Sequence, residues 1–156
     1  MTILPHGTRA PRFELQDQHG RTVALDDFRG SAPVVLVFFP LAFSRTCEGE
    51  LAALRDASDL FAAFGAQVLC VSVDSKFALR AWAEEQGYAF PLLADFWPHG
   101  EVAAAYGAFL EQRGHAARAT FVIDDAGTIR ASFATGPGES RSIAQYRLAL
   151  EALPQA

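Results

Sequence analysis

The side chains best suited to covalent chemistry in this chain are its two cysteines, Cys47 and Cys70. They form no CxxC pair, and the four histidines are scattered without ligand spacing, so the sequence predicts neither a metal site nor a bound cofactor. Two isolated cysteines leave three interpretations open: packing in the core, a reactive thiol, or a slowly forming disulfide pair.

Cys47 stands where a buried strand gives way to a helix. The run PVVLVFF at 33–39 is almost wholly apolar, which is typical of a strand covered on both faces. Pro40 ends this strand because proline cannot donate a ladder hydrogen bond. The segment at 48–65 then carries apolar residues at roughly helical spacing. A helix N-terminus stabilises a thiolate through its free amide groups and its dipole, so Cys47 is predicted to be the reactive cysteine.

Cys70 has a different setting. It lies inside QVLCVSV at 67–73, which is typical of a second buried strand. Free cysteine is among the most buried residue types, so we expect Cys70 to fill space in the core. In a central strand it would reach Cys47 only if the start of the helix unwound.

The elements around these cysteines alternate in type. We expect a hairpin of 13–15 and 22–25, helices over 75–86 and 140–153, and strands over 119–123 and 128–135. This order predicts an α/β, thioredoxin-like fold in which a central mixed sheet has helices on both faces. The length of 156 residues suits one domain spanning 1–156.

Pro40, Ser44 and Cys47 form the pattern P-x-x-x-S-x-x-C, which resembles the peroxiredoxin signature P-x-x-x-T/S-x-x-C. The longer string PLAFSRTCEGEL is similar to the alkyl hydroperoxide reductase E-type, one-cysteine subgroup. FPLLADFWPHG, the AYGAF that follows it, and RATFVID also resemble that subgroup. The resemblance extends from about Ala10 to Ile129.

The resemblance implies a role for each matching residue. Cys47 becomes the peroxidatic thiolate, Ser44 supplies a hydroxyl donor near the peroxide, and Pro40 shields the thiolate from water. Arg118 becomes the active-site arginine, and Glu50 positions an arginine. Each partner of the cysteine also has a plainer interpretation: Ser44 as a helix cap, Pro40 as a strand end, Arg118 as a surface charge and Glu50 as an acid in the first helical turn.

Neighbouring residues carry further expectations. Glu48 follows Cys47 directly, so we expect its carboxylate to disfavour the thiolate unless it faces solvent. Arg45 is a possible partner for Glu50. Phe39 and Phe43 flank the motif and predict an apolar mouth suited to organic hydroperoxides.

A peroxidase of this kind needs a second thiol to recycle it. The place five residues after Cys47, where several subgroups have a resolving cysteine, holds Ala52. The sequence therefore predicts a one-cysteine cycle with an external reductant, either a small thiol or a thioredoxin- or glutaredoxin-like protein. The resemblance also implies a homodimer.

Charge and composition narrow the alternatives. The net charge of −5 disfavours nonspecific binding to nucleic acid or to anionic membranes. The N-terminus lacks the pattern of a secretory signal, so we expect a cytoplasmic protein. Two further functions use the same scaffold: a peroxide sensor that relays oxidation to a partner protein, and a noncatalytic interaction module. A disulfide oxidoreductase is disfavoured because Glu50 occupies the second position of a CxxC pair.

Overall fold

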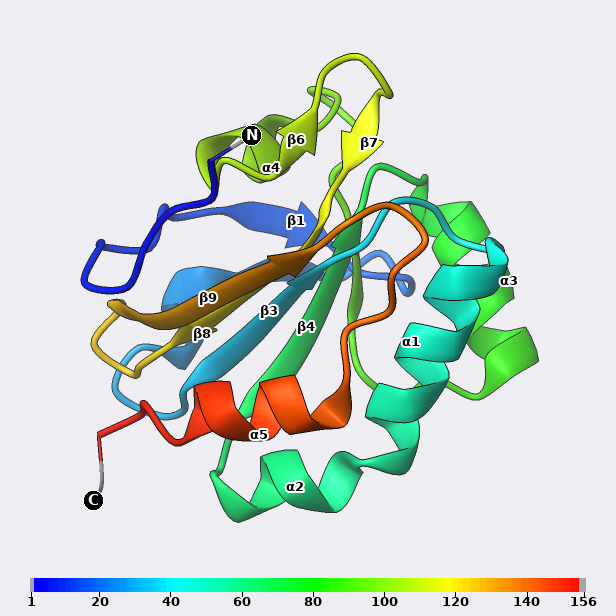
Figure 1. Ribbon diagram of the computed structural model, residues 1–156. Coiled ribbons are helices and arrows are strands. Elements are labelled where there is room, and N and C mark those ends of the chain that lie inside the picture. The colour runs from blue at the N-terminus through cyan, green and yellow to red at the C-terminus, as the bar shows by residue number, and fades with distance from the viewer. Residues whose placement is uncertain (1, 155–156) are drawn as a thin grey trace.

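A seven-stranded mixed sheet forms the centre of the molecule in the computed structural model, which describes residues 2–154 (Figure 1). The strands of this sheet are β1 (Glu14–Gln16), β2 (Thr22–Ala24), β3 (Val34–Phe38), β4 (Gln67–Ser72), β5 (Leu92–Ala94), β8 (Arg118–Ile123) and β9 (Ile129–Thr135). Their order is β2-β1-β5-β4-β3-β8-β9. The β3–β4 and β4–β5 pairs are parallel, and the other pairs are antiparallel. A separate short hairpin joins β6 (Phe109–Leu110) to β7 (His115–Ala116).

Helices cover both faces of the sheet, as Figure 1 shows. They are η1 (Leu25–Phe28), α1 (Arg45–Asp56), α2 (Ser58–Ala63), α3 (Lys76–Gln86), α4 (Glu101–Ala105) and α5 (Ile143–Leu150). Side chains of α1, α2, α3 and α5 share one buried cluster, whereas those of η1 and α4 belong to the other. No helix within residues 2–154 is long and apolar enough to cross a membrane.

The central strand β3 explains why the sheet has two cores. Its side chains alternate, so that Val35 and Val37 face the cluster under α1 and α5 while Leu36 and Phe38 face the cluster under α4. All five of its residues are buried, which accounts for the unbroken apolar run in the sequence. The mixed α/β architecture predicted from the element order is confirmed.

Several details differ from the sequence prediction. The helix expected up to residue 65 is divided at Ala57 into α1 and α2. The last helix begins at Ile143 rather than at 140, because the Ser142 hydroxyl accepts a hydrogen bond from the Gln145 amide and caps it there. The short elements β5, α4, β6 and β7 were not predicted, since two to five residues give too little periodicity.

Candidate active site

Cys47 is the third residue of α1, and its side chain is fully buried. The first hydrogen bond of this helix runs from the Glu48 amide to the Ser44 carbonyl at 2.9 Å. The amides that precede Glu48 therefore have no partner inside the helix, and they surround the sulfur with partial positive charge. The position predicted for Cys47 at a strand-to-helix junction is confirmed.

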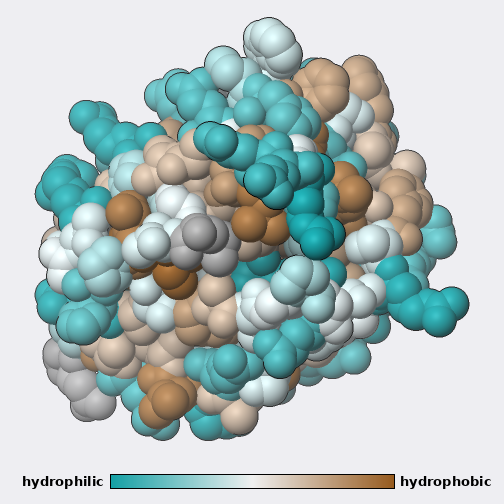
Figure 2. Space-filling view, turned by 45° about the horizontal axis from the view of Figure 1, so that its top comes forward, coloured by the Kyte–Doolittle hydropathy of each residue, from teal (hydrophilic) through white to brown (hydrophobic). Residues whose placement is uncertain are grey.

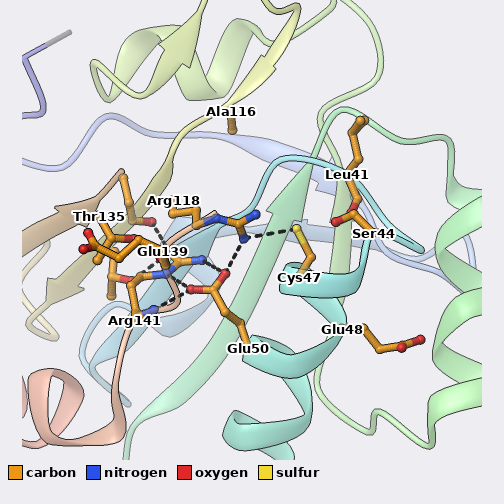
Figure 3. A network of polar contacts seen from close by, with 12 residues as sticks. Leu41, Ser44, Cys47, Glu48, Glu50, Ala116, Arg118, Thr135, Glu139 and Arg141 are labelled. Carbon is orange, nitrogen blue, oxygen red and sulfur yellow. Dashed lines mark hydrogen bonds and ion pairs between the residues drawn. The ribbon is translucent and has the colours of Figure 1, made fainter. Parts of the chain in front are cut away.

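Arg118 brings a full positive charge to the same sulfur. It is the first residue of β8, and pairing of Ala119 with Phe38 sets it beside the end of β3, near the start of α1. Its Nη1 donates a hydrogen bond to Cys47 Sγ at 3.3 Å (Figure 3). The Arg118 side chain is 7% exposed, so little water screens this interaction. The surface-charge interpretation of Arg118 is wrong.

Glu50 holds two arginines at once. Its Oε1 accepts hydrogen bonds from Arg118 Nη1 at 2.7 Å and from Arg141 Nη2 at 3.0 Å. Its Oε2 accepts from the Arg141 amide and from Arg141 Nε, both at 2.8 Å. Because both guanidiniums converge on one carboxylate, Glu50 fixes where Arg118 points. Arg45, the partner considered from the sequence, is exposed and forms no ion pair among residues 2–154.

The buried charges in this cluster do not cancel. Burial acts to raise the pKa of Glu50, but the hydrogen bonds and charge of Arg141, and the hydrogen bond from Arg118, outweigh it and lower the pKa. The carboxylate is therefore ionised at neutral pH beside two permanently charged guanidiniums. One negative charge against two positive charges leaves the cluster at +1. A thiolate at Cys47 is the charge that neutralises it.

Arg141 is a site residue that the sequence analysis missed. It lies in the loop before α5, and its side chain is fully buried. Its Nη1 also donates to the Ala119 carbonyl at 3.0 Å and to Thr120 Oγ1 at 3.1 Å, which ties the loop to β8. The sequence separation of 91 between Arg141 and Glu50 hides this relation from any local pattern.

Ser44 occupies the N-cap position of α1, although its side chain does not cap the helix. Its hydroxyl instead donates to the Leu41 carbonyl at 2.9 Å. Toward a bound peroxide, Ser44 Oγ thus offers lone pairs, and it would donate only after rotation.

The loop between β3 and α1 is held by Asp74, whose Oδ2 accepts a hydrogen bond from the Ala42 amide at 2.8 Å. Phe43 adopts the left-handed conformation at φ 68°, a strained state for a residue with a side chain.

Glu48 is directed away from Cys47 (Figure 3). Its Oε1 accepts a hydrogen bond from Gln86 Nε2 at 2.7 Å, and its backbone carbonyl accepts from the Tyr88 hydroxyl at 3.2 Å. The carboxylate therefore faces the end of α3 rather than the sulfur. This geometry weakens the expected effect of Glu48 on the thiolate, because the repulsion falls with distance.

Cys70 lies in the middle of β4 and is fully buried in the cluster that also contains Cys47. Both cysteines are free. Burial raises the pKa of the Cys70 thiol far above its usual range, which keeps it protonated at neutral pH. A protonated, enclosed thiol is a poor nucleophile, in keeping with the core-packing interpretation.

A cavity of about 370 Å³ lies beside this cluster. Pro40 and Arg118 are among its lining residues, so the motif proline and the arginine border the same cavity. Phe39 and Phe43, expected to form an apolar mouth, are absent from the lining: Phe39 is fully buried against Trp82. A larger hollow of about 590 Å³ lies among Pro33, Phe64 and Leu153, away from these residues.

Within residues 2–154, no group of three or more His, Cys, Asp or Glu side chains is arranged to hold a metal ion. The side chains gathered at the site are a buried sulfur, a guanidinium that touches it, and a carboxylate that accepts a hydrogen bond from that guanidinium. Such a set favours a thiolate nucleophile and stabilises a negatively charged leaving oxygen.

Comparison with known proteins agrees with this chemistry. Residues 6–132 match the model of the AhpC/TSA family. Alkyl hydroperoxide reductase E of Mycobacterium tuberculosis is 47% identical over 151 residues, covering 97% of this chain and 99% of that protein. The crystal structure of peroxidoxin BcpB from Mycobacterium tuberculosis superposes with a TM-score of 0.83 at 30% identity, over 96% of each chain. Enterococcus faecalis AhpC has a TM-score of 0.86 at 28% identity, over 97% and 92% of the two chains.

Proposed function

The chain belongs to the AhpC/TSA family of peroxiredoxins, which are thiol-dependent peroxidases, and on that premise we propose that Cys47 is the thiol its hydroperoxide substrates oxidise. The observation that carries this assignment is the hydrogen bond from Arg118 Nη1 to Cys47 Sγ at 3.3 Å. Cys70 has no such partner, and its burial keeps it protonated.

The reaction follows from the placement of these groups. The Cys47 thiolate attacks the terminal oxygen of the hydroperoxide, an S–O bond forms, and the O–O bond breaks. The products are the cysteine sulfenic acid and an alkoxide, which takes a proton to become the alcohol. Arg118 stabilises first the thiolate and then the leaving oxygen, because its charge lies between the sulfur and the cavity.

Three residues are proposed to support this step without forming covalent bonds. Glu50 acts as a positioning residue, since its carboxylate fixes Arg118 Nη1. Pro40 lines the cavity and limits the access of water to the sulfur. Ser44 Oγ is proposed to accept a hydrogen bond from the hydroperoxide, because its own hydrogen is engaged by Leu41.

We propose an organic hydroperoxide as the substrate that the cavity fits. A water molecule occupies ~30 Å³ of liquid, so hydrogen peroxide needs about twice that volume. The cavity of about 370 Å³ is several times larger and lies within the range of sites for small organic ligands. Hydrogen peroxide would still react, but most of the cavity would hold water.

Recycling is proposed to use an external thiol, either a small thiol or a thioredoxin- or glutaredoxin-like protein. The proposal is supported by the setting of Cys70, which is poorly suited to resolve the sulfenic acid because its protonated sulfur is enclosed in β4. The cycle then has one cysteine: the external thiolate attacks the sulfenic acid, water leaves, and a second thiol releases the mixed disulfide. We expect it to operate in the cytoplasm, where thiols are kept reduced.

A homodimer is the proposed assembly. Parallel strands β3, β4 and β5 end at one edge of the sheet, and the segments that follow them carry five of the large exposed apolar side chains found within residues 2–154. These are Leu41, Phe43, Phe77, Phe96 and Trp97. Phe77 is 75% exposed and Trp97 81% exposed, values that a second copy of the chain would reduce. Sedimentation of wild type and Trp97→Asp tests this, and an unchanged dimer in the variant would place the interface elsewhere.

Intact-mass analysis tests the central assignment. Wild type, Cys47→Ser and Cys70→Ser receive one equivalent of peroxide in the presence of a sulfenic-acid trap. We expect the trapped adduct in wild type and in Cys70→Ser, and none in Cys47→Ser. Loss of two hydrogens by monomeric wild type would show instead that Cys70 resolves Cys47. Turnover with a small thiol then separates a peroxidase from a sensor that passes its oxidation to one protein.

A further inference from the structure

The cavity beside Arg118 carries positive charge. Besides Arg118 it is lined by Arg113 and His115 of the β6–β7 hairpin, with the remainder supplied by small and apolar groups: Pro40, Leu110, Ala117, Thr135, Gly136, Pro137 and Gly138. None of the described lining residues is acidic. The whole chain has a net charge of −5, so this cavity contrasts with the rest of the molecule.

Hydrogen bonds within residues 2–154 engage Nη1 of Arg118 but leave other donors of the two arginines without a partner. Arg118 Nε is buried and has no hydrogen-bond partner within residues 2–154. Arg113 lines the same cavity and is exposed, and its guanidinium forms no hydrogen bond or ion pair with the described residues. Figure 2 shows that the face carrying β6 and β7 mixes hydrophilic and hydrophobic groups, without one continuous apolar surface.

The neighbouring carboxylates do not neutralise Arg113. Glu139 is the acid nearest the loop at 136–138, and its Oε1 accepts a hydrogen bond from the Gly136 amide at 3.1 Å. Glu111 lies in the same hairpin as Arg113 but is exposed and outside the lining. His115 Nδ1 lies 3.0 Å from the Ala116 carbonyl, so this ring nitrogen is engaged within the hairpin. Arg113 is left as the group able to bind an anion.

We propose that Arg113 is a specificity-determining residue that binds the carboxylate of organic hydroperoxides bearing one, while their peroxide group reaches Arg118 and Cys47. This rests on the proposed function. A guanidinium matches a carboxylate with two parallel hydrogen bonds, which fixes orientation as well as position. Because Arg113 is exposed, screening limits its effect, and the expected preference for the acid over a neutral analogue is about fivefold.

A second anion site also prevents misbinding. A carboxylate that bound Arg118 directly would occupy the place of the peroxide and block the reaction. Because Arg113 and Arg118 line the same cavity, their two guanidiniums can serve two different ends of one substrate. The volume of about 370 Å³ is sufficient for a substituted aromatic hydroperoxide to lie between them.

The test compares two hydroperoxides that differ only in charge: cumene hydroperoxide with a para-carboxylate, and the methyl ester of that compound. Stopped-flow rate constants for Cys47 oxidation are measured for wild type, Arg113→Gln and the matched control Arg80→Gln. Arg80 is exposed on α3 and pairs with Glu84, so its variant changes net charge equally without altering the cavity. Hydrogen peroxide, which has no carboxylate, serves as the reference for each variant.

Wild type and Arg80→Gln are expected to prefer the acid by about fivefold, and Arg113→Gln to show a ratio near one. In wild type, raising the salt concentration should also reduce the ratio. An equal ratio in wild type and Arg113→Gln would overturn the proposal. Binding of 4-isopropylbenzoate, which has no peroxide group, is measured separately by calorimetry. It tests Arg113 even if Cys47 proved unreactive toward every peroxide, and binding unaffected by Arg113→Gln would likewise refute the proposal.

Discussion

Replacing Glu50 with glutamine should destabilise the protein far more than its size suggests. The substitution preserves the shape of the side chain but removes the negative charge that two buried guanidiniums share. The glutamine amide would also direct a donor at groups that are themselves donors, in place of a carboxylate that accepts four hydrogen bonds.

The magnitude follows from burial. Removing one partner of a buried ion pair typically costs ~3–5 kcal/mol, because the remaining charge is left uncompensated. Here Arg118 and Arg141 are 7% and 0% exposed, so neither can regain water without opening the loop before α5. For a chain of about this length, each kcal/mol lowers Tm by ~2–4 °C, which predicts a fall of ~6–20 °C.

Urea unfolding at several pH values measures the effect, with Glu84→Gln as the matched control. Glu84 pairs with Arg80 on the surface, where both side chains are more than half exposed, so its loss should cost less than ~1 kcal/mol. The folded-state pKa of Glu50 lies below its ordinary value of 4.5. Its contribution is therefore complete above pH 4.5 and is lost as the pH falls through the lower folded-state value.

The difference in unfolding free energy between wild type and Glu50→Gln should thus be largest near pH 7 and shrink below pH 4.5. A loss as small as that of Glu84→Gln, or a difference that stays constant down to pH 3, would refute the view that Glu50 is the ionised centre of the cluster.

Three further substitutions probe the groups around the site. Arg141→Met leaves Glu50 with one guanidinium, so we expect a loss of ~3–5 kcal/mol in urea unfolding and slower oxidation of Cys47 in stopped flow; normal stability would contradict this. Cys70→Ala should cost ~1–2 kcal/mol through the space it leaves and still form the sulfenic acid, as mass spectrometry would show. Tyr88→Phe removes the hydrogen bond to the Glu48 carbonyl, so it should lower the free energy of unfolding by ~1 kcal/mol. Because Glu48 directly follows Cys47, the variant should also speed alkylation of Cys47, and an unchanged labelling rate would disprove this.

Elements with a strong local signal were predictable from the sequence. The apolar runs at 33–39 and 67–73 became β3 and β4, with bounds within one or two residues. The predicted helix at 75–86 became α3, whose N-cap Ser75 accepts a hydrogen bond from the Ala78 amide and whose C-cap Gly87 is left-handed at φ 73°. These signals are local, so no knowledge of packing was needed.

Elements that depend on tertiary pairing were not predictable. Strand β5 has three residues and exists because Leu92 and Leu93 pair with β4 and are buried there. The division of the first long helix at Ala57 likewise has no proline or glycine to announce it. In both cases the packing of distant segments decides the structure, which a pattern in one window of sequence does not contain.

The same distinction applies to the site. The spacing of Pro40, Ser44 and Cys47 lies within one window of sequence, and the resemblance supplied Arg118. Arg141 is one arginine among several, in a loop rich in glycine and serine, and its importance appears only when the fold brings it to Glu50. The charge balance of the buried groups would have been a useful signal. A role for Glu50 in positioning one arginine does not by itself explain why a second arginine, Arg141, also contacts it.

Charge balance also explains how this site can lower the barrier to peroxide reduction. With a thiolate at Cys47 the four ionised groups sum to zero, and the negative charge lies 3.3 Å from Arg118 Nη1. When that charge passes to the leaving alkoxide, the same guanidinium is placed to stabilise it, because Arg118 also lines the cavity. Arg118 therefore needs no reorganisation as the charge moves, which is the condition under which a fixed dipole or charge lowers a barrier most. The neutral sulfenic acid then leaves the cluster at +1 again, so an incoming thiolate is attracted for the same reason that the first was stabilised.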